Sequence, residues 1–226
     1  MSVLIFVDIA EGQVKKASLE ALSYGAKVAE QLGTSAEGVV LGTPKEDLAA
    51  LGKYGVSKVH HVNNPALDHL DAQVYTKVIA QVAQAVSATV IIFPNNMDGK
   101  SIAPRLSARL KAGLISGAVA LPDTSNGFTV KKNVFSGKAF ANISISTPVK
   151  IIALNPNAYP VKAGEGTATV EAFNATVDTP KVKVTSSTKA SGEVPLTEAE
   201  IVVSAGRGLK GPENWGMVED LAKVLH

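Results

Sequence analysis

"VLIFVDIAEGQVKKASLEALSYGAKVAEQLG", residues 3–33, sets a pattern of one strand followed by one helix. Residues 3–9 are almost continuously apolar, which is typical of a strand buried on both faces of a parallel sheet. Residues 15–33 carry apolar side chains at helical spacing and close on Gly33, a residue type that commonly ends a helix. A buried strand joined to an amphipathic helix is the building unit of α/β proteins.

The same alternation continues up to residue 121. Strand-like apolar runs occupy residues 35–42, 57–62, 88–94 and 114–121, and helix-like periodicity occupies residues 45–55, 70–87 and 95–113. Strict alternation of strands and helices predicts a mostly parallel sheet with helices on both faces. The fold class that we predict is therefore α/β.

The pattern changes after Pro122. Residues 127–135, 137–146 and 149–156 are strand-like runs joined by short turns, so we predict that they form an antiparallel extension of the same sheet. The first domain, an α/β scaffold, is expected to span residues 1–160.

The remainder of the chain divides into two further parts. Residues 161–196 are rich in Thr, Ser, Ala and Lys and predict an extended segment and linker, with one candidate strand within residues 177–195. Residues 197–226 carry one strand and one helix, which cannot bury their faces alone. We therefore expect them to be the truncated start of a second α/β domain that continues beyond His226.

Composition excludes several classes of protein. The chain has 226 residues, 46% of them hydrophobic, which is enough to bury a full core. The net charge of +2 comes from 22 basic and 20 acidic residues and disfavours nucleic-acid binding. The chain has no cysteine and no long apolar run, which excludes disulfides and predicts no membrane insertion. The N-terminus lacks the features of a signal or transit peptide, so we expect a cytoplasmic location.

Motifs of catalytic and metal sites are missing. The sequence contains no GxSxG, HExxH or CxxC, so we assign neither catalytic nor metal-ligating residues. His60 and His61 are adjacent in a predicted strand, where neighbouring side chains point to opposite faces, which disfavours a shared metal site.

A glycine-rich turn follows the last predicted strand, within IVVSAGRGLKGPENW, residues 201–215. The spacing of Gly206 and Gly211 invites comparison with a phosphate-binding P-loop. The comparison fails because Pro212 and Glu213 stand where the lysine and hydroxyl residues should be. The glycine spacing does not fit a dinucleotide fingerprint either.

The turn formed by Gly206, Arg207 and Gly208 could still bind an anion. Two glycines let the backbone approach a ligand closely, and a guanidinium between them can donate two hydrogen bonds to phosphate oxygens. The residues alone leave open the alternative of a solvated strand-to-helix turn.

Polar residues also follow the predicted strand at residues 88–94. Asn95, Asn96, Asp98 and Ser101 stand where open α/β sheets bind ligands. Residues of these types at this place are also typical helix caps, and we favour capping.

Three segments together resemble the alpha subunits of electron-transfer flavoproteins. They are FPNNMDGKSIAPRLSARLKAGLISGAVAL (93–121), FSGKAFANISISTPVKIIALNPNAYP (135–160) and IVVSAGRGLKGPENWGMVEDLAKVL (201–225). SAGRGLKGPENW is the most specific of the matching motifs. The family's later segments, which surround the isoalloxazine ring, have no counterpart here and would follow His226.

The resemblance implies a function. Members of this family are heterodimers of an alpha and a beta subunit that carry one FAD, with a structural AMP held in the beta subunit. They are electron carriers and not substrate-converting enzymes. Their FAD takes electrons from acyl-CoA dehydrogenases of fatty acid β-oxidation and from related dehydrogenases, and passes them to a quinone oxidoreductase.

The resemblance also implies roles for parts of this chain. Gly206, Arg207 and Gly208 would contact the FAD phosphates, in a site that is incomplete within the chain. Residues 1–160 would form a Rossmann-like scaffold of the adenine-nucleotide-hydrolase type that contacts the beta subunit. We therefore expect weak or no FAD binding by the chain alone. The alternative is a stand-alone nucleotide-binding regulatory module of the universal-stress type.

Overall fold

The computed structural model describes residues 1–186, 196, 199 and 201–225. The chain forms two compact units, Met1–Thr185 and Ser186–His226. The sequence placed the end of the first domain near residue 160, whereas the first compact unit reaches residue 185.

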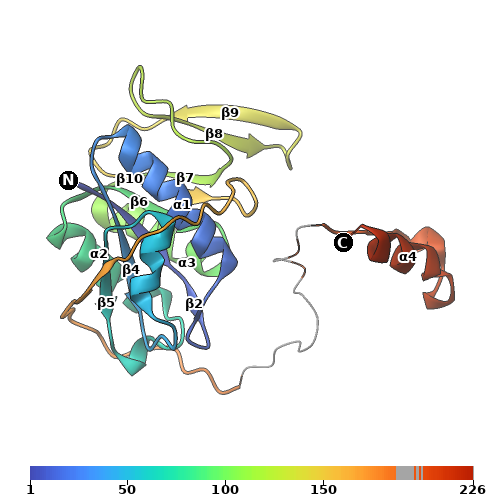
Figure 1. Cartoon of the computed structure of the whole chain (residues 1–226), viewed down its shortest axis with the longest axis horizontal. Coiled ribbons are helices and arrows are strands. Elements are labelled where there is room, and N and C mark those ends of the chain that lie inside the picture. The colour runs from blue at the N-terminus through green and yellow to red at the C-terminus, as the bar shows by residue number, and fades with distance from the viewer. Residues whose placement is uncertain (187–195, 197–198, 200, 226) are drawn as a thin grey trace. The chain divides into compact units, whose positions relative to one another are not determined.

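Nine strands of the described residues form one sheet in the first unit, in the order β11-β5-β4-β1-β6-β10-β7-β8-β9 (Figure 1). These strands are β1 (Ser2–Val7), β4 (Ser35–Leu41), β5 (Lys58–Val62), β6 (Ala88–Pro94), β7 (Gly113–Ala118), β8 (Thr129–Val134), β9 (Ala139–Ser144), β10 (Lys150–Leu154) and β11 (Thr169–Ala172). All pairs from β11 to β7 are parallel, and β7–β8 and β8–β9 are antiparallel. The prediction of a mostly parallel sheet with an antiparallel extension is confirmed.

The position of β10 differs from the prediction. We predicted that residues 149–156 belong to the antiparallel extension, but β10 lies inside the parallel sheet and pairs with both β6 and β7. The physical reason is its composition: the four residues after Lys150 are apolar, and all four are buried. A strand of this kind is stabilised most where helices cover both of its faces, in the middle of the sheet.

Helices cover both faces of the sheet, as predicted. Helix α1 (Lys16–Gln31) contributes Leu22 and Tyr24 to one apolar cluster, and this cluster also contains Ile5 of β1. Helices α2 (Ala72–Ala85) and α3 (Met97–Leu110) pack on the other face, where Phe6 of β1 lies in their cluster. Successive residues of β1 thus enter opposite clusters, as the pleat of a strand requires.

Short elements connect these helices and strands. A two-stranded antiparallel ribbon, β2 (Ile9–Ala10) and β3 (Gln13–Val14), lies between β1 and α1. Two 3₁₀ helices, η1 (Leu48–Tyr54) and η2 (Pro65–Leu67), flank β5 in the chain.

Residues 161–185 pack along the first unit. β11 extends the sheet beyond β5, and the N–H of Phe173 donates to the carbonyl oxygen of His61 (2.8 Å). Farther along, the N–H of Lys181 donates to Oδ2 of Asp71 (2.9 Å). The predicted extended segment therefore finds its backbone partners at the open edge of β5 and at the start of α2.

The described part of the second unit consists of short helical elements. These are η3 (Arg207–Leu209), η4 (Pro212–Asn214) and α4 (Gly216–Val224). The predicted helix is present, but residues 201–205 form no strand within the described residues 201–225. The reason is that a strand is stable only beside another strand. None of the described helices is long and apolar enough to cross a membrane.

Candidate functional site

The turn at residues 206–208 is a tight coil held by its own backbone. Gly206 precedes η3, and its carbonyl oxygen accepts a hydrogen bond from the N–H of Leu209 (3.2 Å). The N–H of Lys210 donates to the carbonyl oxygen of Arg207 (3.0 Å). Lys210 itself has φ +66°, in the left-handed region that a lysine adopts at some cost.

Gly206 and Gly208 are not required by the packing of the described residues. A Cβ at either position would meet nothing within 4 Å, and neither residue has a positive φ. Glycine is normally needed for a left-handed backbone, for close packing or for the close approach of a ligand. The first two reasons are missing at these positions, so the space beside the turn is open to a ligand.

The turn is tied to the start of α4. Nδ2 of Asn214 donates to the carbonyl oxygen of Leu209 (2.8 Å), and the N–H of Trp215 donates to the carbonyl oxygen of Pro212 (3.0 Å). The first bond joins the turn to η4 and the second closes η4 just before α4, so the turn is connected to α4 through η4.

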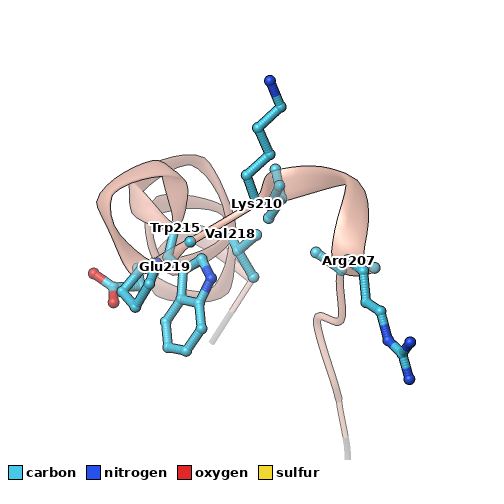
Figure 2. Close-up of a pocket in the computed structure, with 10 residues that line it drawn as sticks. Arg207, Lys210, Trp215, Val218 and Glu219 are labelled. Carbon is cyan, nitrogen blue, oxygen red and sulfur yellow. The ribbon is translucent and has the colours of Figure 1, made fainter.

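A pocket of about 430 Å³ lies between the turn and α4. Its lining residues are Ala205, Gly206, Arg207, Leu209, Lys210, Gly211, Pro212, Trp215, Val218 and Glu219. Figure 2 shows Trp215, Val218 and Glu219 on the side of the helix, with Arg207 and Lys210 on the turn and their side chains extended away from each other. Trp215 is 50% exposed. The pocket therefore has an aromatic surface on the side of the helix and two cationic residues on the side of the turn.

The two cations of the pocket have no charged partner in the part of the chain that the structure describes. No ion pair or side-chain hydrogen bond there involves Arg207 or Lys210. An unpaired guanidinium is free to make bidentate hydrogen bonds to a phosphate. Of the three residues named from the sequence, Gly206 and Arg207 line the pocket, and Gly208 lies between Arg207 and the lining residue Leu209.

A second polar region lies at the topological switch point of the sheet. β1 and β6 are neighbours, but the chain leaves β1 toward β4 on one side and leaves β6 toward β10 and β7 on the other. Open α/β sheets commonly bind ligands at the carboxyl ends of two such strands. Asp8 follows β1 directly, and Asn95 and Asn96 follow β6.

Lys15 links two carboxylates at this switch point. Its Nζ lies 2.8 Å from Oδ2 of Asp8 and 3.0 Å from Oδ2 of Asp98. Nδ2 of Asn96 also donates to Oδ2 of Asp8 (2.7 Å). We call Asp8, Lys15, Asn96 and Asp98 the switch-point cluster. Within it, the lysine charge is already shared between two carboxylates.

Burial and charge shift the pKa values of this cluster. Burial raises the pKa of Asp8 to about 6, with a further increase from the charge of Asp98, although Lys15 and Asn96 oppose the shift. Burial lowers the pKa of Lys15, but its hydrogen bonds and charge interactions with Asp8 and Asp98 outweigh burial, so the net shift is upward. Lys15 therefore stays charged near neutral pH, whereas Asp8 can take up a proton just below it.

The capping prediction for the segment after β6 is confirmed for Asn96. Its Oδ1 accepts a hydrogen bond from the N–H of Gly99 (2.9 Å) at the start of α3. Asn95 has a different role: it donates to Oδ1 of Asn155 (2.7 Å) and accepts from Oγ of Ser116 (3.2 Å). The hydrogen bonds of Asn95 thus connect the segment after β6 to Ser116 of β7 and to Asn155, which follows β10.

Sequence reasoning missed the role of Asp8. The signal was available, because Asp8 is the one charged residue in the apolar run of residues 3–9. Its partners could not be read from spacing alone, since Asp98 lies 83 positions after Lys15.

The two adjacent histidines have separate partners. Nε2 of His60 lies 2.6 Å from Oε2 of Glu37, and Nε2 of His61 lies 2.9 Å from the carbonyl oxygen of Gly42. No group of three or more potential metal ligands occurs among the residues that the structure describes.

Comparison with known proteins places the chain in a family. A sequence model of the electron transfer flavoprotein domain matches residues 3–178. The chain belongs to the electron transfer flavoprotein family. The alternative of a universal-stress module has no support in the comparisons.

Two of the three relatives named here for this electron transfer flavoprotein chain are alpha subunits by name. It is 28% identical over 229 residues to "Electron transfer flavoprotein subunit alpha" of Bacillus subtilis, covering 99% of this chain and 69% of that protein. It is also 28% identical over 232 residues to "Protein FixB" of Clostridium saccharobutylicum, with the same coverage. A "Probable electron transfer flavoprotein subunit alpha, mitochondrial" of Cryptococcus neoformans is 29% identical over 228 residues, covering 97% of this chain and 64% of that protein.

The two kinds of match cover different parts of the flavoprotein chain. The family match lies within the first unit and ends before the pocket, whereas the matches to relatives extend over nearly the whole chain. The likeness therefore includes the segment that carries Arg207.

Proposed function

We propose that this chain is the alpha subunit of a heterodimeric electron carrier. In this proposal the partner is a beta subunit that holds AMP, and one FAD receives electrons from acyl-CoA and related dehydrogenases and passes them to a quinone oxidoreductase. The proposal is supported by membership of the electron transfer flavoprotein family and by the names of the relatives. The chain would act as a carrier and not as a substrate-converting enzyme, because bound FAD supplies the redox chemistry.

The observation that carries this proposal is the unpaired Arg207 between two glycines that the packing of the described residues does not require. Arg207 would hold the FAD phosphates through bidentate hydrogen bonds, and Gly206 and Gly208 would let those phosphates approach the backbone. Lys210 would add a second positive charge, and Trp215 an apolar wall.

The first unit would serve as the scaffold that contacts the beta subunit. Its switch-point cluster is a poor place for a phosphate, since Asp8 and Asp98 both lie against Lys15 and neutralise it. Like charges within a few ångströms repel an incoming anion. The proposal therefore assigns the FAD phosphates to the pocket of the second unit and not to the sheet of the first.

The pocket can be tested directly because Trp215 is the single tryptophan of the chain. Its fluorescence, excited at the long-wavelength edge of tryptophan absorption, reports binding of ADP, which carries the diphosphate and adenosine portion of FAD but does not absorb there. We expect weak, saturable binding to the chain. Arg207→Gln should weaken it about 10-fold or more, since a hydrogen bond to a charged group contributes ~1.5–3 kcal/mol.

The matched control is Arg105→Gln, which removes the same charge from an exposed position on α3. This variant should bind ADP as the wild type does. Equal affinity of the Arg207 and Arg105 variants would contradict the assignment of Arg207.

A second experiment concerns the incomplete site. Because the described pocket offers two cationic residues and one aromatic wall, too little to enclose a whole FAD, we expect the chain purified alone to lose FAD. Yellow colour or flavin absorption that persists through purification would contradict this expectation. A cytoplasmic location stays a prediction: two of the relatives named above come from bacteria, and the third is named as mitochondrial.

A further inference from the structure

The exposed side of α3 and its C-cap is strongly basic. Residues 99–122 contain no aspartate or glutamate, and their four cationic residues, Lys100, Arg105, Arg109 and Lys111, are all exposed. The chain has three arginines among its 22 basic residues, and two of the three stand on this helix. The planar donors of arginine fit a carboxylate in bidentate fashion, which makes this side of α3 a candidate surface for an acidic molecule.

These four cations have no charged partner among the described residues. No ion pair there involves them, and the acidic residue of α3, Asp98, is held by Lys15. The neighbouring helix α2 contains no aspartate or glutamate either. The dipole of α3 favours Arg109 in the last turn but disfavours Lys100 in the first, so helix stability does not explain the whole set. The positive charge is therefore available to another molecule.

A strip of mostly small side chains runs between the cations. Its members stand four, three and four positions apart, which places them on one face of a helix. They are Met97, Ser101, Pro104 and Ala108. Arg105 and Arg109 lie along one side of this strip, and Lys100 lies along the other. Because small side chains at a contact let two helices approach closely, the strip can receive a helix between charges on both sides.

Pro104 interrupts the hydrogen bonds of α3 on the same face. Proline has no N–H, so the carbonyl oxygen of Lys100, four positions earlier, lacks its helical donor. A proline inside a helix costs stability, and packing of the core does not require this one, since Pro104 is exposed. The carbonyl oxygen of Lys100 can therefore accept a hydrogen bond from a docked molecule.

The shape and charge of this face favour a protein helix over two other occupants. Helices that lie on lipid surfaces bury large apolar side chains such as Trp, Phe and Leu, whereas Met97 is the one large apolar member of the strip. A second copy of α3 would set cations against cations, and like charges repel. An acidic helix of a different protein fits both the small side chains and the positive charge.

The rigidity of α3 indicates a single partner. Proteins that bind many partners commonly use flexible surfaces that repack, whereas α3 is a regular helix held in the core by Ile102, Ala103 and Leu106. In the proposed function the electron donors are several dehydrogenases, and the acceptor is one quinone oxidoreductase. An electrostatic contact also speeds association, which suits a carrier that binds its acceptor repeatedly.

We propose that the exposed face of α3 is a docking site for an acidic helix of the quinone oxidoreductase. Carboxylates of that helix bind Arg105 and Arg109, its backbone lies along the strip of small side chains, and one of its donors reaches the carbonyl oxygen of Lys100. The packing of a helix into a groove is an established mode of protein recognition. The inference rests on the proposed function, which supplies this partner.

The test uses the complete heterodimer with bound FAD, reduced and mixed with purified quinone oxidoreductase. Arg105→Glu with Arg109→Glu should raise KM for the carrier about 10-fold or more at low salt and leave kcat unchanged, because docking is altered and the flavin is not. The increase should shrink at about 1 M salt, which screens exposed charges. Arg105→Lys with Arg109→Lys keeps the charge but loses the planar donors, and should raise KM about 2- to 5-fold.

The matched control is Lys53→Glu with Lys162→Glu, which reverses two exposed charges beside α1. Its KM should stay near that of the wild type. Equal increases for the two charge reversals would reflect net charge alone and would overturn the assignment to α3. An unchanged KM for the arginine reversal would overturn the inference, while electron transfer to the oxidoreductase would uphold the proposed function. If the wild-type heterodimer passes no electrons to the oxidoreductase, the proposed function is overturned together with the inference.

Ala108→Trp tests the shape of the strip without a change of charge. The indole would hold a docked helix away from α3, so KM should rise about 10-fold, by a similar factor at low and at high salt. Ala163→Trp, at an exposed position beside α1, is the control and should leave KM unchanged. A normal KM for the Ala108 variant would overturn the docked helix, because the cations would then act by long-range attraction alone.

Two further measurements separate the oxidoreductase from other occupants of this face. The arginine reversal should assemble with the beta subunit and bind FAD as the wild type does. Weaker assembly would mean that the beta subunit covers α3, and would overturn the inference. The heterodimer should not sediment with vesicles of phosphatidylcholine and phosphatidylserine in a ratio of about 7:3. Sedimentation that the arginine reversal abolishes would assign the face to lipid and would also overturn it.

Discussion

The switch-point cluster and the C-terminal pocket both place polar and charged residues before a helix, but they leave their charges in different states. At the switch point, Lys15 is held between two carboxylates within 3.0 Å. In the pocket, Arg207 and Lys210 have no such partner among the described residues. In the first arrangement Lys15 offsets the charge of the buried carboxylate and the cluster repels an anion, whereas the second leaves positive charge available for one. Topology alone would have favoured the switch point, because switch points are the usual ligand sites of open sheets.

The largest expected effect comes from removing the cation of the switch-point cluster. Lys15→Met leaves Asp8, which is buried, without its ion-pair partner. We expect a loss of about 2–3 kcal/mol in the free energy of unfolding at pH 8, below the range for fully buried pairs because Lys15 is partly exposed. The loss should be smaller at pH 5, where Asp8 takes up a proton. Urea unfolding followed by far-UV circular dichroism at both pH values measures it.

The control for this variant is Lys27→Met, which breaks an exposed ion pair with Glu30. Its effect should stay below about 1 kcal/mol at either pH. Similar losses for both variants would mean that the switch-point cluster is no more than a surface ion pair.

A pair of glycine variants contrasts the two regions next. A Cβ at Gly99 would lie 1.9 Å from the carbonyl oxygen of Pro94, so Gly99→Ala should shift α3 and cost about 2 kcal/mol of stability. A Cβ at Gly208 would meet open space, so Gly208→Ala should leave the thermal midpoint unchanged. The second variant should instead weaken ADP binding, measured by Trp215 fluorescence. A Gly99 variant as stable as the wild type would contradict the packing role of Gly99. Unaltered ADP binding by the Gly208 variant would contradict the ligand role of Gly208.

The third prediction concerns pH. The pKa of Asp8 is raised to about 6 in the folded chain, so the folded state binds this proton more tightly than the unfolded state does. Stability should therefore decrease as the pH rises from about 4 to above 6, by at most ~1.4 kcal/mol for each tenfold difference in proton affinity between the two states. Asp8→Asn removes this component, and the difference between the two curves of stability against pH isolates it. Parallel curves would show that Asp8 titrates normally.

The smallest effect is expected for Lys210→Gln. As a point charge without the planar donors of arginine, Lys210 should contribute about 2- to 5-fold to ADP affinity, less than Arg207. Raising the salt concentration should diminish this difference. If Lys210→Gln weakened ADP binding more than Arg207→Gln does, Lys210 and not Arg207 would be the main phosphate contact.

Much of the fold could be predicted because it depends on local patterns. The apolar run at residues 3–9 and the helical spacing at residues 15–33 are properties of neighbouring residues, and the structure has β1 and α1 at these places. The cap at Asn96 is similarly local, since its partner is the N–H of Gly99 three positions later. For the candidate site, the glycines and Arg207 could be named from the sequence for the same reason.

Other features could not be predicted because their partners are distant in the sequence. β10 looks like the third strand of a meander when it is read beside β9, and its burial between β6 and β7 depends on strands that come much earlier. The segment at residues 161–185 has a linker's composition, yet β11 completes the edge beside β5. In both places the free energy of burying or pairing the strand outweighs the structure that the neighbouring residues predict.

The sequence by itself determined the alternation of strands and helices and the position of the Gly-Arg-Gly turn, because periodicity and turn chemistry act over a few residues. Only the tertiary structure decided which charges are neutralised. Asp8 and Asp98 reach the same lysine because β1 and β6 end side by side, whereas no carboxylate of the described residues reaches Arg207. Charge pairing depends on distances of a few ångströms in space, and the fold sets those distances.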